Sequence, residues 1–203
     1  MKENKEQEIL QAAERLFADK GFKASTTTLI ATEAGVTHAM LHYYFRTKEH
    51  IFLRVFDSYV KSILSELRAV MAPDVYDAGP IRKVTELCFD FFNEHRGQMS
   101  LILEVARERP DILETYVSEI KNYLGSSYSS HRDRIEKAVK EGRIAPITFN
   151  ELLMDIISIC SAPFFFDPVI SNVIKLDEKQ KAALLARRRE EAVELIANRL
   201  TIK

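Results

Sequence analysis

The stretch from Ser25 to Lys48, STTTLIATEAGVTHAMLHYYFRTK, constrains the fold of this 203-residue chain more than any other. Its first residues carry hydroxyl groups, which can accept hydrogen bonds from the free amides at the start of a helix. Gly35 stands where that helix must end, since glycine tolerates the left-handed backbone that such an end usually requires. Thr37 can cap a second helix, whose inward residues Leu41 and Phe45 are four positions apart. The stretch therefore predicts a helix-turn-helix.

The outward face of the second helix carries small, polar and aromatic side chains, which can enter a DNA major groove and contact base edges. Four basic residues and one acidic residue lie between Lys20 and Lys48, although the whole chain has a formal net charge of -1. This small basic region favours a reader of specific sequences over a protein that coats nucleic acid. The residues predicted to contact DNA, with the last beside a phosphate, are Ser25, Thr26, Thr27, Thr28, Thr37, His38, Ala39, Met40, His42, Tyr43, Tyr44 and Lys48.

Three segments near the N-terminus resemble one known family. They are ILQAAERLFADKGF (residues 9–22), TTLIATEAGV (residues 27–36) and LHYYFRTKEHIF (residues 41–52). Together they resemble the tetracycline-repressor (TetR) family of bacterial transcriptional regulators over roughly the first quarter of the chain. The resemblance implies that His38, Ala39 and Met40 occupy variable positions that read bases. The chain departs from the family at His42 and Tyr44, because the family often has Tyr at the first position and His at the second.

The rest of the chain predicts an all-α protein, because apolar residues recur at helical spacing and no alternating strand pattern occurs. Thr148 with Glu151, and Asp177 with Gln180, have the spacing of capping boxes, and Gly97 is expected to end a helix. A DNA-binding domain of three helices is predicted over residues 1–47 and a larger helical domain over residues 48–203. The predicted helices beyond the helix-turn-helix span residues 5–20, 47–71, 80–96, 98–108, 110–140, 148–162 and 178–200.

The resemblance implies two roles for the larger domain. In the family, the last two long helices pair with their copies in a second subunit as a four-helix bundle, and the central helices enclose a small-molecule pocket. Apolar stripes over residues 148–162 and 178–200 agree with this in outline, and symmetric pairing of such stripes is common. The residues expected at the dimer interface are Leu152, Ile156, Ile159, Leu185, Val193, Ile196 and Leu200.

Aromatic residues are the candidates for an effector pocket, with two polar partners. Aromatic stripes in helices belong to the core more often than to a ligand site, so core packing is the simpler interpretation for each of these residues. Phe164 to Phe166 lie between Pro163 and Pro168, so they are expected outside a regular helix, with at least one ring capping a cavity or a subunit interface. The expected effector is apolar or aromatic. The candidates are Phe89, Phe92, His95, Arg107, Tyr116, Tyr123, Phe164, Phe165 and Phe166.

Composition and motifs argue against several other classes of protein. The chain is 46% hydrophobic and 29% charged, which is typical of a globular protein. Its N-terminus has no apolar core of a secretory signal, and no segment is apolar over the roughly 18 residues that a membrane span needs. We therefore expect a cytoplasmic protein with no membrane partner. No P-loop, dinucleotide fingerprint or nucleophile elbow occurs, so neither an enzyme nor a cofactor is expected.

Metal and redox chemistry are also not expected. His38 and His42 have the i,i+4 spacing of a zinc pair, but no nearby side chain supplies a convincing third ligand. Cys88 and Cys160 have apolar neighbours in the sequence and are expected to be reduced core thiols.

These observations favour a homodimeric repressor that binds an inverted-repeat operator on double-stranded DNA and leaves it when an effector binds. Two alternatives stay open. One is an effector-independent regulator or an activator, which a solid core without a polar-lined cavity would favour. The other, from a different class, is a helical interaction or structural protein in which the helix-turn-helix is only a packed pair.

Overall fold

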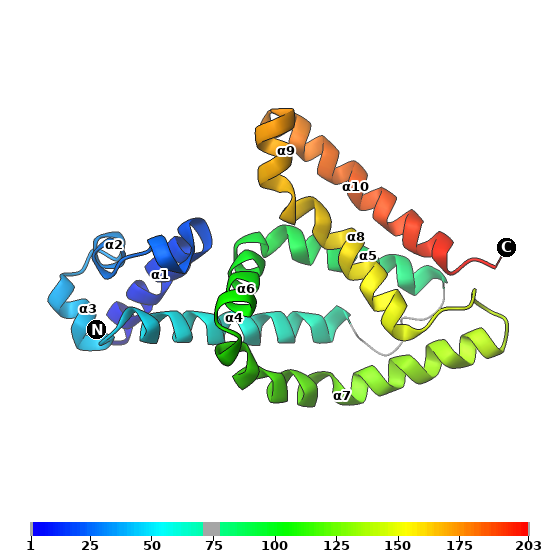
Figure 1. Cartoon of the computed structure of the whole chain (residues 1–203), viewed down its shortest axis with the longest axis horizontal. Helices are drawn as coiled ribbons and strands as arrows, with labels where there is room; N and C mark the ends of the chain where they lie inside the picture. The colour runs from blue at the N-terminus through cyan, green and yellow to red at the C-terminus, as the bar shows by residue number, and fades with distance from the viewer. Residues whose placement is uncertain (1, 71–77, 203) are drawn as a thin grey trace. The chain divides into compact units, whose positions relative to one another are not determined.

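The computed structural model describes residues 2–70 and 78–202, and every regular element within these ranges is an α-helix (Figure 1). This confirms the predicted all-α class. The helices are α1 (Lys2–Ala24), α2 (Thr27–Glu33), α3 (His38–Tyr44), α4 (Lys48–Val70), α5 (Ala78–Glu94), α6 (Arg96–Glu108), α7 (Pro110–Lys140), α8 (Phe149–Phe165), α9 (Asp167–Ile174) and α10 (Glu178–Arg199).

Local signals in the sequence place many of the helix ends correctly. The backbone of α1 leaves the helical conformation at Gly21, with φ 73° and ψ 172°. Gly142 follows α7 with φ 66°, as a left-handed helix end requires. Both predicted capping boxes are present, at Thr148 before α8 and at Asp177 before α10. Each of these signals involves residues within one turn of each other, so distant parts of the chain do not disturb it.

Gly97 does not end a helix, as had been expected, but lies in the first turn of α6. A Cβ atom at this position would lie 2.7 Å from the Cβ of Ala18 on α1. The glycine is therefore explained by the close approach of two helices and not by a turn.

The end of α8 also differs from the expectation. Phe164 and Phe165 lie inside the helix, which contains Pro163, so the expectation that they lie outside a regular helix is wrong. Pro163 has no amide hydrogen to donate to the carbonyl four residues earlier, but it stands in the last turn, so only the end of α8 is affected. Phe166 joins α8 to α9, a short helix that was not predicted and that has a proline in its first turn.

The chain forms two compact units. The first contains residues 1–65 and 97–117, and the second contains residues 66–96 and 118–203. In the first unit, α1 and α4 enclose a cluster of aromatic rings, in which the Phe52 ring lies 5.5 Å from that of Phe17 and 4.7 Å from that of Phe22. The predicted domain boundary after residue 47 falls within this unit and stays a prediction.

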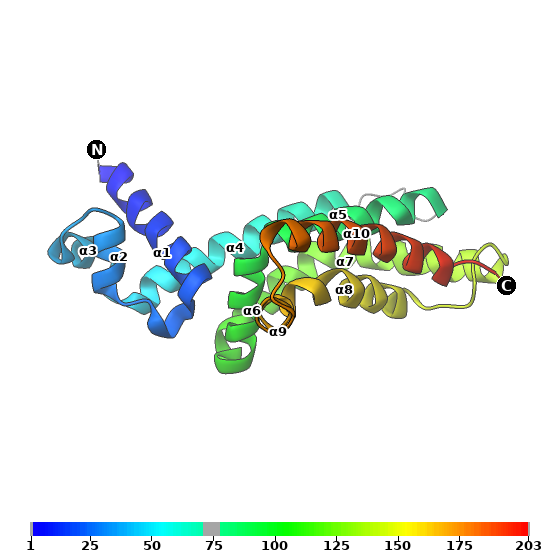
Figure 2. The ribbon, with the colours of Figure 1, turned by 90° about the horizontal axis from the view of Figure 1, so that it is seen from above.

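In the second unit, α5, α8 and α10 pack against one another (Figure 2). The buried residues Leu152, Ile156 and Cys160 of α8 contribute to this core. At its edge, Arg189 on α10 donates hydrogen bonds to both carboxylate oxygens of Asp90 on α5, each at 2.7 Å. This paired contact ties the last helix to α5.

Candidate nucleic-acid interface

Local hydrogen bonds build the pair formed by α2 and α3. Thr26 caps α2 by accepting a hydrogen bond from the Leu29 amide at 3.2 Å, and Thr37 caps α3 by accepting one from the Met40 amide at 3.1 Å. Gly35, between the helices, has φ 62°. The predicted helix-turn-helix is therefore confirmed, with Thr26 as the hydroxyl residue that caps its first helix.

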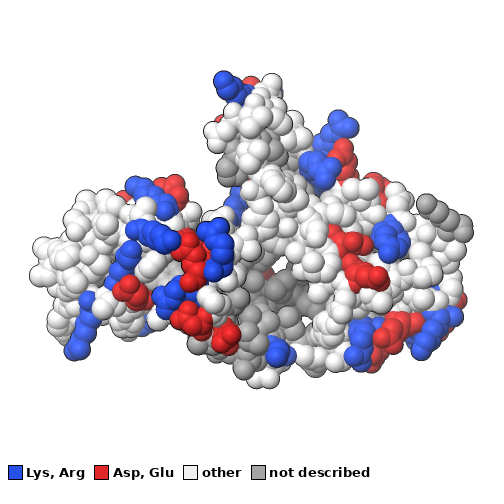
Figure 3. All heavy atoms as spheres, viewed as in Figure 1, with Lys and Arg blue, Asp and Glu red and all other residues white. Residues whose placement is uncertain are grey.

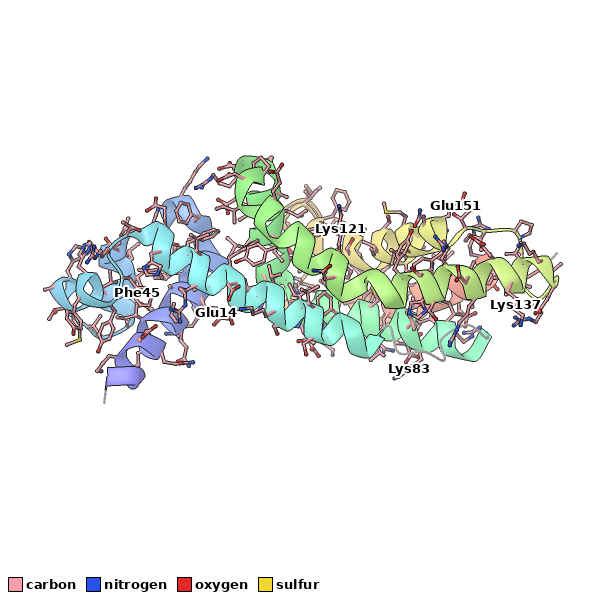
Figure 4. All side chains as sticks on the ribbon, turned by 90° about the horizontal axis from the view of Figure 1, so that it is seen from below. Glu14, Phe45, Lys83, Lys121, Lys137 and Glu151 are labelled. Atoms are coloured by element: carbon pink, nitrogen blue, oxygen red, sulfur yellow. The ribbon has the colours of Figure 1, made fainter. Side chains whose placement is uncertain are left out.

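Buried apolar side chains hold α3 in a single orientation. Ile30 and Ala31 on α2 are buried, as are Leu41 on α3 and Phe45 at its end. The ring of Phe45, labelled in Figure 4, lies 5.6 Å from that of His50 in α4. Because this face of α3 is enclosed by its neighbours, the opposite face is turned to solvent.

The solvent face of α3 carries the side chains that were predicted to read bases. Tyr43 is 69% exposed and Met40 is 40% exposed. His38, Ala39 and His42 are exposed as well. On the face drawn in Figure 3, few charged side chains cover the α2 and α3 end of the first unit. Uncharged side chains suit contacts with base edges, whereas phosphate contacts position a protein without reading sequence.

Two histidines on this face are held by hydrogen bonds. His38 Nε2 lies 3.1 Å from the hydroxyl oxygen of Thr27, and His42 Nδ1 lies 3.2 Å from the carbonyl oxygen of Arg46. The two imidazole rings are 4.4 Å apart and nearly perpendicular. The reading face thus contains two rings whose orientation is set before any DNA is bound.

Ser25 does not lie on the reading face, so its predicted DNA contact is wrong. Its side chain has no exposed surface, and its hydroxyl donates to the carbonyl oxygens of Leu16 at 3.0 Å and Gly21 at 2.8 Å. These bonds satisfy carbonyl groups near the end of α1. Because Ser25 joins α1 to α2, its hydroxyl has a structural role.

Lys48 also has an internal partner. Its ammonium group donates to the carbonyl oxygen of Phe22 at 2.9 Å and lies 4.1 Å from the centre of the Phe22 ring. The side chain therefore connects the start of α4 to the end of α1, and its phosphate contact stays a prediction. Among the other predicted residues, Thr28 is exposed, while Tyr44 is half-buried with its ring 5.3 Å from that of Tyr43.

Residues 9–55 match the model of a family described as bacterial regulatory proteins, tetR family. The match contains α2, α3 and the start of α4, and so includes the whole reading face. This part of the chain is a TetR-family DNA-binding region. It is 26% identical over 139 residues to the HTH-type transcriptional regulator YhgD of Bacillus subtilis (strain 168), over 68% of this chain and 71% of that protein.

Two further comparisons extend the similarity. Identity to the HTH-type transcriptional activator FasR of Mycolicibacterium smegmatis (strain ATCC 700084 / mc(2)155) is 29% over 97 residues, which are 48% of this chain and 44% of FasR. A solved TetR family transcription regulator from Marinobacter aquaeolei VT8 aligns with a TM-score of 0.64 at 16% identity, over 100% of this chain and 98% of that one. This structural likeness shows a shared fold along the whole chain.

Several of the predicted pocket residues meet in the second unit. The ring of Phe89 lies 5.1 Å from that of Phe164, and the ring of Phe92 lies 6.4 Å from that of Phe165. His95 Nε2 lies 2.9 Å from a carboxylate oxygen of Glu66. The other ring nitrogen of His95 is buried and has no hydrogen-bond partner among the described residues. These contacts form an aromatic cluster with one unsatisfied polar atom.

The other pocket candidates do not join this cluster in the described contacts. Tyr116, in the first unit, packs its ring 5.4 Å from that of Phe56 and donates to Asp57 at 3.4 Å. Arg107 is exposed and pairs with Glu108. The side chain of Tyr123 lies outside the described residues.

A hollow of about 340 Å³ opens in the second unit between α8, α9 and α10. Its wall is mainly apolar, and Phe166 is the predicted pocket residue that reaches it. Lys181 and Asp167 form an ion pair at 2.7 Å within the wall. Phe166 is thus the ring of the Phe164–Phe166 run that lies at a cavity, whereas α9, which forms part of the wall, was not predicted. The lining residues are Ala162, Pro163, Phe166, Asp167, Ile174, Lys181, Leu184, Leu185 and Arg188.

Most residues predicted at the dimer interface are buried within one chain. Leu152, Ile156, Val193, Ile196 and Leu200 all have less than a tenth of their surface exposed, so their assignment to an interface is wrong. They form the contact of α8 and α10 with their own unit. Ile159 and Leu185 are half-buried.

Other apolar side chains of the same region are exposed. Met154, Ile157 and Phe165 follow one stripe of α8, with Met154 61% exposed. On α9, Val169, Val173 and Ile174 are exposed, as is Leu195 on α10. The sequence pattern could not separate this stripe from the buried one, because both recur at helical spacing.

The two cysteines lie closer together than their sequence separation indicated. The thiol of Cys160 donates to the carbonyl oxygen of Thr85 at 3.6 Å, and Thr85 lies one turn from Cys88 on α5. A hydrogen bond with Cys88, followed by burial, raises the pKa of the Cys160 thiol far above its ordinary value. A thiol of this kind is a poor nucleophile, which agrees with a core role.

Neither a metal-binding cluster nor a membrane-spanning helix occurs in the part of the chain that the structure describes. Across residues 2–70 and 78–202, His, Cys, Asp and Glu side chains form no group of three or more that could hold a metal ion. Within the same residues, every helix is too short or too polar to cross a membrane.

Proposed function

We propose that this TetR-family regulator is a cytoplasmic, homodimeric repressor that binds an inverted-repeat operator and is released by a small apolar or aromatic effector. The observation that carries the proposal is the exposed face of α3, with Tyr43, Met40 and two oriented histidines on a rigid support. Side chains of this kind can contact base edges when a helix lies in the major groove. The proposal gives the protein no enzymatic role.

A dimer is proposed because one α3 offers few contacts. Two copies bound in successive major grooves, about 34 Å apart on one face of the duplex, double the number of base and phosphate contacts. Exposed apolar side chains on α8 and α9 support pairing through this region, because pairing would remove their apolar surface from water. The proposed interface contains Met154, Ile157 and Phe165 in place of the buried residues.

An effector is proposed to bind in the second unit. The hollow beside Phe166 has a volume within the range of small-molecule sites, and its wall is mainly apolar. The buried, unsatisfied nitrogen of His95 supports a second contact point for a ligand in the aromatic cluster. An effector releases DNA only to the extent that it binds the released arrangement more tightly than the DNA-bound one.

The test of DNA binding is selection of bound duplexes from a random pool by the purified protein, with Tyr43→Ala in parallel. We expect an inverted repeat for the wild type and a uniform loss of binding for the variant. Equal affinity of both proteins for the selected duplex would contradict the predicted contact of Tyr43 with DNA. Screening apolar and aromatic compounds against the selected duplex then tests release.

Activation is the second candidate function. FasR, which shares 29% identity with this chain over 97 residues, is named a transcriptional activator. A reporter gene placed behind the selected operator distinguishes the two signs of regulation. Expression should fall when the repressor is present and should rise if the protein is an activator.

A further inference from the structure

The hydrogen bond from His42 determines which of its ring nitrogens carries a proton. Nδ1 lies 3.2 Å from the carbonyl oxygen of Arg46. A carbonyl oxygen can only accept, so Nδ1 must be the donor. In a neutral imidazole, the other nitrogen then has a lone pair and no hydrogen. The exposed His42 side chain therefore has Nε2 as its remaining hydrogen-bonding atom, and this atom is an acceptor.

The hydrogen bond of His38 does not determine which of its ring nitrogens carries the proton. His38 Nε2 lies 3.1 Å from the hydroxyl oxygen of Thr27, and a hydroxyl can either donate or accept. Both neutral forms of His38 are compatible with this contact. The contact does orient the His38 ring, which packs edge to face against the ring of His42 at 4.4 Å. His42 is thus supported on one side by a ring and on the other by a backbone carbonyl.

We propose that His42 is a specificity-determining residue that accepts a hydrogen bond from an amino group of a base, either adenine N6 or cytosine N4. The inference rests on the proposed DNA reading by α3. In the major groove these amino groups are donors, whereas guanine and thymine present O6, N7 and O4, which are acceptors. A neutral His42 facing guanine or thymine would set one acceptor against another, and both would lose their water partners.

The orientation of the ring strengthens this discrimination. A freely rotating side chain could turn a donor toward a keto group, but turning His42 would break the bond to the Arg46 carbonyl. Ordering a side chain before binding also removes part of the entropy cost of the contact. One position in each half-site should therefore carry adenine or cytosine on the strand that His42 faces.

The experiment is selection from a random duplex pool at about pH 8, where imidazole side chains are predominantly neutral, using wild type, His42→Ala and His42→Lys. For the wild type we expect adenine or cytosine at one position of each half-site. His42→Ala should lose the preference at that position and keep it elsewhere. His42→Lys should favour guanine or thymine there, because an ammonium group only donates. Circular dichroism melting of all three proteins checks that the exposed substitutions leave the fold intact.

A single-atom change in the DNA provides the second measurement. Where the selected base is adenine, its replacement by nebularine removes the N6 amino group. Wild-type affinity should fall about three- to tenfold, and the affinity of His42→Ala should not change.

The outcomes separate this inference from the proposed function. Selected sequences that are identical for wild type and His42→Ala, or that carry guanine or thymine at the position that changes, would overturn the role of His42 while leaving DNA reading intact. If the wild type selects no sequence, DNA reading by α3 fails and the inference fails with it.

Discussion

At the scale of single residues, the contact between Lys48 and Phe22 gives a side chain in the DNA-binding region a structural role. The ammonium group both donates to the Phe22 carbonyl oxygen and lies over the Phe22 ring. These two contacts join the end of α1 to the start of α4. The orientation of α3 between them depends on both helices.

Replacing Lys48 with methionine should lower the free energy of unfolding by about 1 kcal/mol, because the variant keeps the alkyl chain and loses the hydrogen bond and the ring contact. Chemical denaturation measures this change, with Lys20→Met at an exposed site near the end of α1 as the control. If Lys48 also contacts a phosphate, as predicted from the sequence, the salt slope of DNA binding should fall by about 1 for each bound chain. An unchanged stability would contradict the structural role of Lys48.

Gly97→Ala should lower the free energy of unfolding by about 1–3 kcal/mol, since the new methyl group would lie 2.7 Å from the Cβ of Ala18. Gly125→Ala is the matched control within α7. Nothing lies within 4 Å of a Cβ there, so this variant should gain about 0.5–1 kcal/mol from helix propensity. Thermal melts of the two variants should therefore shift in opposite directions. Equal shifts would show that α6 does not pack closely on Ala18.

Residue-level predictions succeed where a role depends on neighbours in sequence. Thr37 and Gly35 were predicted correctly because their roles need only the adjacent turn. Ser25 was placed wrongly because the carbonyl of Leu16, which its hydroxyl contacts, is nine residues away. Gly97 was misread for the same reason, since the helix that requires it is far away in the sequence.

At the scale of helices, the ion pair of Asp90 and Arg189 connects α5 to α10. The hydrogen bonds from Arg189 lower the pKa of the Asp90 carboxyl below its ordinary value. A carboxyl whose pKa is lowered by folding stabilises the protein above its unfolded pKa, about 3.9. This contribution disappears as the pH falls through the lower, folded pKa. The pair is partly exposed, so solvent screening keeps it below about 1 kcal/mol.

Asp90→Asn should therefore reduce stability at pH 6 and have a smaller effect at pH 2, because protonation of the wild-type carboxyl removes the same contribution as the pH falls. Urea unfolding at the two pH values measures the difference. Asp133→Asn, at an exposed site on α7, is the control and should change neither value appreciably. A loss for Asp90→Asn that is equal at both pH values would mean that the charge of Asp90 does not stabilise the contact.

Helix prediction was accurate where caps and glycines mark the ends and failed at α9. Prolines were taken as breaks, but Pro163 stands in the last turn of α8 and another proline in the first turn of α9. A proline is favoured in a first turn and disturbs only the end of a helix from a last turn, so the residue type alone could not show where one helix ended and the next began. The sequence therefore indicated a ring at a cavity near Phe166 but not the wall that α9 contributes to it.

At the scale of the whole molecule, the proposed dimer depends on which apolar stripe is left uncovered. Met154→Asp should weaken the dimer about tenfold or more, because it places a charge in the centre of the proposed interface. Sedimentation measures the dissociation constant. Leu103→Asp, at a 51% exposed site on α6, is the matched control and should leave the dimer unchanged.

If Met154→Asp leaves the dissociation constant of the dimer unchanged, the interface lies elsewhere. The sequence could not show which apolar stripe of α8 is buried and which is exposed. Periodicity shows that a helix face is apolar but not which neighbour covers it. Leu152 and Ile156 are buried against their own chain, whereas Met154 and Ile157 are exposed.

The most direct test of a dimeric DNA reader is the effect of half-site spacing on binding to the selected duplex. Insertion of about 5 base pairs between the half-sites turns them to opposite faces of the helix, whereas about 10 restore the face and increase the distance. Two α3 helices held by one dimer predict a large loss of affinity for the first insertion, and a loss for the second that reflects how far the dimer can stretch. Affinity that does not depend on spacing would contradict the account, because it would mean that each chain binds DNA alone.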